Sequence, residues 1–243
     1  MSEFKFPTEE VDLPSKGLLY PKGHPLKSGK LEIKYMTAKE EDILTNQSYI
    51  QKGTVLDKLL ESVIVDKTIN LKDLLIGDKN AILIATRILG YGKNYSFTYK
   101  GETVDVDLTE LDNKPFDDSL IVEEKNELPF TLPHSNAVIT FKLLNGHDEA
   151  KIEAELKGLK KINKDHVPEL TTRLKHIITS VNGETESKDV REFVDGYLLA
   201  QDSRALRKHL KFIQPDVDMN ITLDNGEEVD IPLGLSFFWP DSE

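Results

Sequence analysis

Residues 78–108, which end in Tyr95-Ser-Phe-Thr-Tyr-Lys-Gly-Glu-Thr-Val-Asp-Val-Asp-Leu108, match a second stretch of the same chain. Residues 202–233 end in Met219-Asn-Ile-Thr-Leu-Asp-Asn-Gly-Glu-Glu-Val-Asp-Ile-Pro-Leu233 and align with the first stretch once Asn225 is looped out. In both copies apolar residues first recur at the spacing of a helix. Apolar and polar residues then alternate on both sides of a turn, so the pattern predicts a helix and then a β-hairpin. Because both periods occur in the same order twice, the repeat indicates the architecture better than any single motif.

The repeat extends upstream of these two stretches. Residues 31–44 match residues 139–152 in their apolar positions, with Lys34 opposite Lys142 and Glu41 opposite Glu149. Leu-Pro lead-ins precede both copies, at residues 13–14 and 132–133. Thr37 and Glu40 have the spacing of a capping box, which predicts a strand followed by a helix. We therefore expect an α+β protein of two tandem related modules, each with a strand, several helices and a β-hairpin.

The predicted division of the chain follows from this pattern. We expect an extended N-terminal arm (residues 1–30), a first module (31–108), an acidic linker (109–128), a second module (129–234) and an aromatic C-terminal tail (235–243). Apolar spacing predicts further helices over residues 56–64, 81–89, 168–181, 190–200 and 202–213. The second hairpin is expected to turn at Asp224-Asn225-Gly226.

The composition is that of a globular protein, with 38% hydrophobic and 30% charged residues and a formal net charge of −12. This charge disfavours nucleic acid as a partner unless a basic face is segregated from the rest. The basic clusters, within residues 157–161 and 204–211, lie on helical patterns and are interpreted as solvated faces. The chain has no cysteine, which excludes disulfides and thiol chemistry. Neither an apolar run of membrane-spanning length nor a signal peptide is evident, so no membrane association is expected.

The sequence predicts no catalytic, metal-binding or cofactor-binding residues. The six histidines lack metal-ligand spacing, and the nearest approach, His147-Asp148-Glu149, has no ligand opposite His147 in the other copy. Gly90-Tyr91-Gly92 follows a predicted helix instead of opening one, so it does not form a phosphate loop. Acidic pairs such as Glu123-Glu124 lie in segments predicted to be exposed. We expect a protein that is not an enzyme and has no small-molecule substrate.

Large apolar residues in the arm and tail, and at the hairpins, are candidates for partner binding. In one interpretation the arm and tail fold back on their own modules; in the other they anchor neighbouring subunits, as exposed aromatic residues often do. Tyr99 and Leu223 occupy matching hairpin positions and are predicted to lie in equivalent environments. The candidates are Leu18, Leu19, Tyr20, Tyr99, Leu223, Phe237, Phe238 and Trp239.

Several segments resemble one known family. They are Leu13-Pro-Ser-Lys-Gly-Leu-Leu-Tyr-Pro21, residues 28–44, Lys52-Gly-Thr-Val-Leu-Asp-Lys-Leu-Leu60 and Leu75-Ile-Gly-Asp-Lys-Asn-Ala81. The chain resembles, over nearly its whole length, the baseplate hub and hub assembly proteins of T4-like (T-even-type) contractile-tailed phages. Many relatives carry Cys-x-x-Cys pairs at the hairpins, where this chain has residues 97–101 and 221–226. Structural zinc is therefore not expected, and each hairpin is predicted to be held by packing alone.

The resemblance implies a non-catalytic baseplate hub protein that takes part in assembling a phage contractile tail through protein–protein contacts. The alternative is a transient hub assembly chaperone that is absent from the finished virion. The implied partners are other baseplate hub proteins, and a homo-oligomer is also open. The implied location is the host cell cytoplasm during assembly, and the tail of the virion for a permanent subunit.

Overall fold

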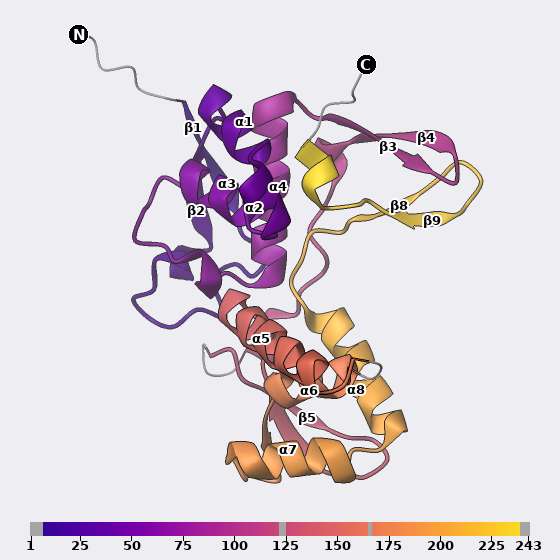
Figure 1. Cartoon of the computed structure of the whole chain (residues 1–243). Coiled ribbons are helices and arrows are strands. Elements are labelled where there is room, and N and C mark those ends of the chain that lie inside the picture. Colours follow the sequence, from indigo (N-terminus) through magenta and orange to yellow (C-terminus); the bar gives the residue numbers. More distant parts are fainter. Residues whose placement is uncertain (1–6, 122–124, 165–166, 239–243) are drawn as a thin grey trace.

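The computed structural model describes residues 7–121, 125–164 and 167–238. The described chain forms two lobes joined at a narrow waist (Figure 1). Helices are combined with small antiparallel sheets, so the predicted α+β class is confirmed. In the described residues, no helix has the length and apolar character needed to cross a membrane.

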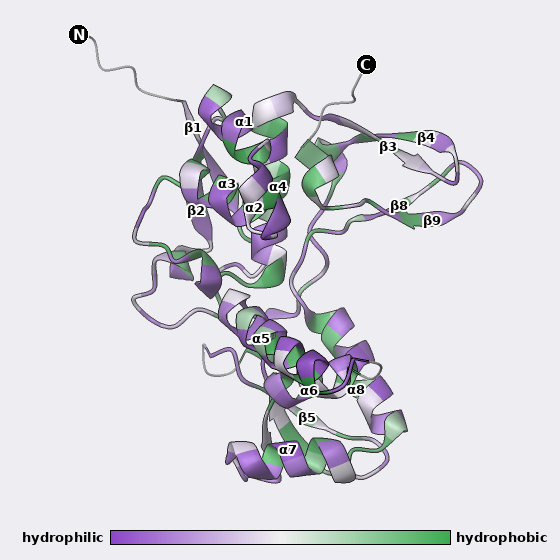
Figure 2. Cartoon of the chain, in the orientation of Figure 1, coloured by the Kyte–Doolittle hydropathy of each residue, from purple (hydrophilic) through white to green (hydrophobic). Residues whose placement is uncertain are grey.

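The first lobe contains an antiparallel strand pair, a helical layer and the first hairpin. Its elements are β1 (Thr8–Asp12), β2 (Lys30–Lys34), α1 (Ala38–Leu44), α2 (Gln47–Gln51), α3 (Val55–Val63), α4 (Ile76–Tyr91), β3 (Asn94–Tyr99) and β4 (Glu102–Asp107). The long helix α4 supplies much of the core, and Figure 2 shows hydrophobic residues along it and on the C-terminal turn beside it.

The second lobe packs helices around a three-stranded sheet in the order β5-β6-β7. Its elements are β5 (Leu128–Thr131), β6 (Val138–Phe141), α5 (Gly146–Ile162), α6 (Glu169–Ile177), β7 (Ile178–Val181), α7 (Ser187–Gly196) and α8 (Ala200–Ile213). The helix predicted over residues 168–181 ends at Ile177, so that prediction was wrong for its last turn. Residues Ile178-Thr-Ser-Val181 pair with β6 instead, because β-branched side chains suit a half-buried strand better than a helix.

A buried aspartate makes corresponding contacts in both lobes. In the first lobe, Asp78 on α4 accepts hydrogen bonds from the Ser15 backbone N–H at 2.9 Å and from the Ser15 hydroxyl at 2.7 Å. In the second lobe, Asp202 on α8 accepts hydrogen bonds from the backbone N–H groups of His134 at 2.8 Å and Ser135 at 3.0 Å. Ser15 and His134 each directly follow a Leu-Pro lead-in, so the aspartate fixes the loop between two strands onto a helix in both copies.

A lysine at the end of a strand also meets a helix cap twice. Lys34 pairs with Glu40 at 2.7 Å, and Glu40 completes the capping box with Thr37 at the start of α1. Lys142 pairs with Asp148 at 2.6 Å, and Asp148 completes a box with Asn145 at the start of α5. In each box the carboxylate is buried, and it satisfies a helix N-terminus that would otherwise leave donors unpaired.

The repeat does not divide the chain into two independent bodies. After α8 the chain leaves the second lobe, and β8 (Asn220–Thr222) and β9 (Glu228–Asp230) form a hairpin beside β3 and β4 (Figure 1). The C-terminal 3-10 helix, Leu235–Phe238, then packs against α4. The first lobe is therefore completed by the last part of the chain.

The predicted arm and linker are also integral to the fold. Within residues 1–30, β1 pairs along its full length with β2, from Thr8 opposite Lys34 to Asp12 opposite Lys30. Within residues 109–128, Lys114 donates its backbone N–H to the Asp216 carbonyl at 2.8 Å, and Asp112 accepts from Asp218 at 2.8 Å. The segment expected to be a linker thus pairs with the segment that returns from the second lobe.

Candidate protein interaction site

The two hairpins lie side by side and project from the first lobe (Figure 1). We call residues 94–107 and 220–230 the hairpin pair. Each hairpin is its own two-stranded sheet, since β3 pairs with β4 and β8 pairs with β9. Strong alternation of apolar and polar residues specifies both, and Gly101 and Gly226 take the positive φ values that their turns require. The repeat thus places two copies of the same element next to each other.

Polar contacts tie the hairpin tips together. Glu227 accepts a hydrogen bond from the Tyr99 hydroxyl at 2.8 Å and forms an ion pair with Lys100. The pKa of Glu227 is lowered, mainly by the hydrogen bond from the Lys100 ammonium and next by the one from the Tyr99 hydroxyl. The Lys100 ammonium also lies over the Tyr99 ring at 5.1 Å. Packing alone was expected to hold each hairpin, and these polar contacts additionally join one hairpin to the other at the tips.

An acidic groove of about 710 Å³ opens between β4 and β8. Asp112 and Asp218, which belong to the backbone pairing of residues 112–114 with 216–218, line the groove at its base, and Asp224 and Asn225 line it at the turn of the second hairpin. Hydrogen bonds, mainly from the Lys93 ammonium and next from the Thr109 hydroxyl, lower the pKa of Asp107 to about 2. This carboxylate is therefore charged at neutral pH. The acidic residues lining the groove are Glu102, Asp105, Asp107, Glu110, Asp112, Asp218 and Asp224.

Of the candidate partner-binding residues, two lie at the hairpin pair. Tyr99 is the last residue of β3, and Leu223 directly follows β8. Both side chains are half-buried. Leu223 lines the acidic groove, and Tyr99 contacts Glu227 at the tips. Both side chains are therefore near the surface and remain candidates for partner contact.

The arm and tail candidates lie elsewhere. Leu19 and Tyr20 are buried, with the Tyr20 hydroxyl donating to Asp78 at 2.7 Å and accepting from the Leu75 backbone N–H at 3.0 Å. Burial, followed by the nearby Asp78 charge, raises the pKa of Tyr20. Leu18 is half-buried. Leu19 and Tyr20 are therefore packed inside the first lobe, as in the interpretation in which the arm folds back on its own module.

The aromatic tail is built into the first lobe rather than into the module that precedes it. Phe237 and Phe238 are buried, and the Phe237 ring meets the Tyr95 ring edge-on at 4.8 Å. The Arg87 guanidinium donates to the Phe237 carbonyl at 2.9 Å. Trp239 lies outside the described residues. The described aromatic residues of the tail thus belong to the core.

The acidic and histidine side chains considered for chemistry are engaged separately. His147 contacts Asp73 at 2.8 Å, Asp148 pairs with Lys142, and Glu149 pairs with Arg173 at 2.8 Å. Asp73 also contacts His24 at 3.2 Å, so it bridges an N-terminal loop and α5 across the waist. Among the residues that the structure describes, no three His, Asp or Glu side chains converge to hold a metal ion.

Sequence reasoning missed the roles of Lys100 and Glu227. The two residues are 127 positions apart, and nothing in either local pattern indicates their pairing. The alignment of the two hairpins was the one available signal, since elements that match often pack together. No protein family, curated protein or solved structure matches this chain.

Proposed function

We propose that this chain is a non-catalytic baseplate hub protein of a contractile-tailed phage, and that it acts in tail assembly by binding other hub proteins through the hairpin pair. The hub assignment comes from the resemblance of the N-terminal block and the segments that follow it. The observation that supports an assembly role is the hairpin pair itself: a braced projection with an acidic groove, presented away from both cores.

The use of the buried ionisable groups supports a non-catalytic role. Asp78 and Asp202 hold loops, and Glu40 and Asp148 hold helix N-termini. The Ser15 hydroxyl is bonded to the Asp78 carboxylate, but both side chains are fully buried, so no substrate reaches this pair. These groups fix the fold, whereas a catalytic site needs a nucleophile, a base and an acceptor that converge on a substrate.

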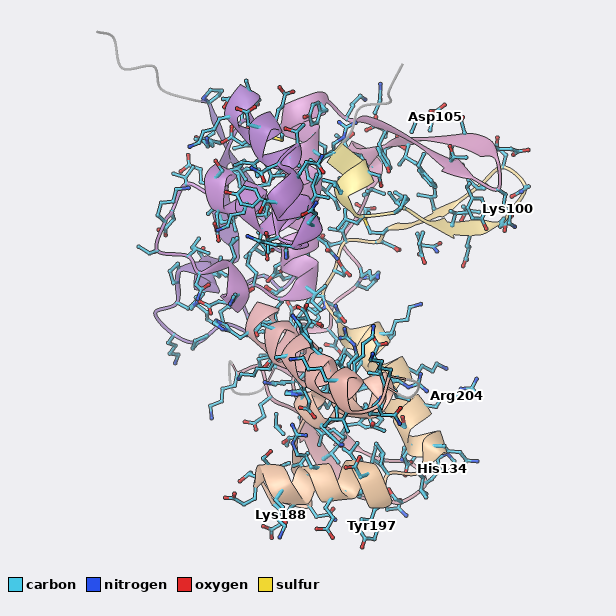
Figure 3. The ribbon with its side chains drawn as sticks, viewed as in Figure 1. Lys100, Asp105, His134, Lys188, Tyr197 and Arg204 are labelled. Carbon is cyan, nitrogen blue, oxygen red and sulfur yellow. The ribbon has the colours of Figure 1, made fainter. Side chains whose placement is uncertain are left out.

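Loss of the hairpin surface tests the proposal. Tyr99→Ala and Leu223→Ala remove apolar contact area at the hairpin pair, and we expect the double variant to enter tail particles at least about tenfold less than the wild type. Tyr197→Ala is the matched control, because Tyr197 is an exposed tyrosine (65%) that directly follows α7, at the far end of the second lobe (Figure 3). Circular dichroism confirms that each variant is folded before incorporation is compared.

The location of the wild-type chain separates the permanent subunit from the assembly chaperone. A permanent subunit is retained in washed particles, whereas a chaperone is present in hub intermediates and missing from particles. Equal incorporation of the wild type and the Tyr99/Leu223 variant would exclude the hairpin pair as the contact surface. It would leave the hub assignment to be decided by the presence of the chain in particles or intermediates.

A further inference from the structure

A basic stripe runs along the exposed side of α8. Arg204, Lys208 and Lys211 are spaced by four and three residues, so they share one face of the helix, and all three are exposed. Within the described part of the chain, no carboxylate lies within ion-pair distance of any of them. Phe212 extends the stripe, with 77% of its side chain exposed. A protein of net charge −12 thus carries an uncompensated positive face with an aromatic residue at its end.

An apolar groove adjoins this stripe. It has a volume of about 410 Å³, lies between α6 and α8, and is lined by Leu170, Leu174, Ile177 and Leu210. Its polar lining has four cations against one carboxylate, and consists of Lys114, Arg173, Arg207, Lys211, Gln214 and Asp216. Such a surface favours an occupant that combines carboxylates with some apolar area. We call the stripe and the groove together the α8 face.

The hairpin pair of the same chain has this complementary chemistry. Its groove is lined by seven acidic residues, and Leu223, Val104 and Ile221 supply apolar area among them. Of the acids facing that groove, Asp107 has a lysine partner, whereas Glu102 and Asp224 are exposed without a cation within ion-pair distance in the described chain. The chain therefore displays an acidic surface and a basic surface, each only partly neutralised from within.

The two surfaces lie toward the same side of the molecule. In Figure 3, Lys100 and Asp105 on the hairpin pair and Arg204 on α8 all project toward the same edge, with the waist between them. A second copy, related to the first by half a turn about an axis beside the waist and outside that edge, has its hairpin pair opposite the α8 face of the first copy. The same rotation brings its α8 face opposite the first hairpin pair. Both contacts form together, which is the arrangement of a two-fold dimer.

We propose that the chain forms a two-fold symmetric homodimer in which the hairpin pair of each copy binds the α8 face of the other. The acidic groove meets Arg204, Lys208 and Lys211, and the apolar residues of the hairpins cover Phe212 and the groove between α6 and α8. The contact occurs twice per dimer, so each weak charge pairing is doubled. The dimer covers the hairpin pair, so a hub protein would bind that surface in the monomer, in competition with dimerisation. The dimer itself does not depend on the hub assignment.

Charge reversal on each surface tests the dimer by sedimentation equilibrium of the full chain over about 1 to 100 µM. The wild type is expected to approach twice the chain mass of 27.5 kDa and to dissociate as NaCl rises from about 0.05 to 0.5 M. Variant A carries Glu102→Lys, Asp105→Lys and Asp224→Lys. Variant B carries Arg204→Glu, Lys208→Glu and Lys211→Glu. Each variant alone is expected to be monomeric, with dimerisation weakened at least about tenfold.

Mixing the two variants is the decisive part of the experiment. In a heterodimer of A and B, the basic hairpins of A face the acidic α8 of B, and the basic α8 of A faces the acidic hairpins of B. An equimolar mixture is therefore expected to dimerise although each variant alone does not, which also shows that both variants are folded. The matched controls are Lys157→Glu/Lys161→Glu on α5 and Glu153→Lys/Glu192→Lys on α5 and α7, which reverse exposed charges elsewhere and are expected to leave the dimer intact.

Four results would overturn the proposal. The first is a wild type that stays monomeric at every concentration and salt, in which case the α8 face is free for another acidic partner. The second is a dimer that neither variant weakens. The third is a mixture of A and B that fails to associate when both show the wild-type circular dichroism spectrum. The fourth is an assembly that grows beyond a dimer as the concentration rises. It would indicate an open head-to-tail contact in place of the closed two-fold one.

Discussion

The buried carboxylate of Glu40 should make the stability of the fold depend on pH in a defined way. The exposed fraction of its side chain is 0%, and it accepts hydrogen bonds from Lys34, from the Thr37 backbone and hydroxyl, and from Ser62. Burial opposes ionisation, but the Lys34 ammonium and the hydroxyls of Ser62 and Thr37 outweigh it and lower the pKa of Glu40 from 4.5 to about 2. The charged form is therefore bound more tightly by the folded chain than by the unfolded one.

The magnitude follows from the linkage between proton binding and folding. A pKa lowered from 4.5 to about 2 corresponds to about 3 kcal/mol of folding free energy at neutral pH. Because the folded pKa is the lower one, this contribution is present above the unfolded pKa and is lost as pH falls through the folded pKa. Gln does not titrate in this range, so Glu40→Gln should cost about 3 kcal/mol at pH 7 and about 1 kcal/mol at pH 3.

Urea-induced unfolding followed by circular dichroism measures this difference between wild type and variant at each pH. The effects of other titrating groups cancel in the comparison, because both proteins share them. Glu41→Gln is the control, since Glu41 is exposed on the same helix and should change stability by less than about 0.5 kcal/mol. A cost of Glu40→Gln that is the same at pH 7 and pH 3 would refute the reasoning.

Three further substitutions test the packing. Phe237→Ala should destabilise the first lobe by about 3 to 5 kcal/mol in urea unfolding, because the buried ring leaves a cavity against Tyr95. Gly77→Ala should lower the melting temperature, because a Cβ there would lie 1.9 Å from the Pro215 carbonyl oxygen, where the chain returns from the second lobe. Glu227→Ala should speed amide hydrogen exchange at both hairpin tips, because it removes the acceptor for Tyr99 and Lys100, and should leave the exchange of α4 unchanged.

Each of these substitutions has a control of the same kind. Tyr197→Ala removes an exposed aromatic ring and should change stability by about 0.5 kcal/mol at most, so an equal cost at Tyr197 and Phe237 would contradict the tail placement. Gly158→Ala lies in α5 with open space around it and should stabilise the chain, so a stable Gly77→Ala protein would contradict the close contact. Glu228→Ala is the control for Glu227→Ala, because it removes the neighbouring carboxylate, which is exposed on β9. Unchanged tip exchange in Glu227→Ala would show that the tips are not tied.

Local patterns predicted much of the fold because they depend on residues close together in sequence. The spacing of Thr37 and Glu40 predicted a capping box, and the box begins α1. The turn at Asp224-Asn225-Gly226 was predicted from residues that tolerate its backbone, and Gly226 takes a positive φ there. The aligned Leu-Pro lead-ins and aspartates predicted a repeat, and the loops bonded to Asp78 and Asp202 follow it.

Contacts between residues far apart in the sequence could not be predicted from these local patterns. Residues 178–181 read as the end of a helix, and only the presence of β6 beside them makes a strand more favourable. The tail reads as a separate aromatic segment, because its partners Tyr95 and Arg87 lie more than a hundred residues earlier. The pairing of residues 112–114 with 216–218 is equally remote in sequence. A duplicated sequence indicates similar local folds, but it does not say that one copy will complete the lobe of the other.

Quantitative mass spectrometry of washed phage tail particles tests the proposed hub function most directly. The measured quantity is the number of copies of this chain per copy of a known hub protein, in finished particles and in hub intermediates from the same infected cells. A permanent hub subunit predicts a fixed ratio in both samples, and the chaperone alternative predicts the chain in intermediates alone. Absence of the chain from both particles and intermediates would contradict a role in the baseplate hub.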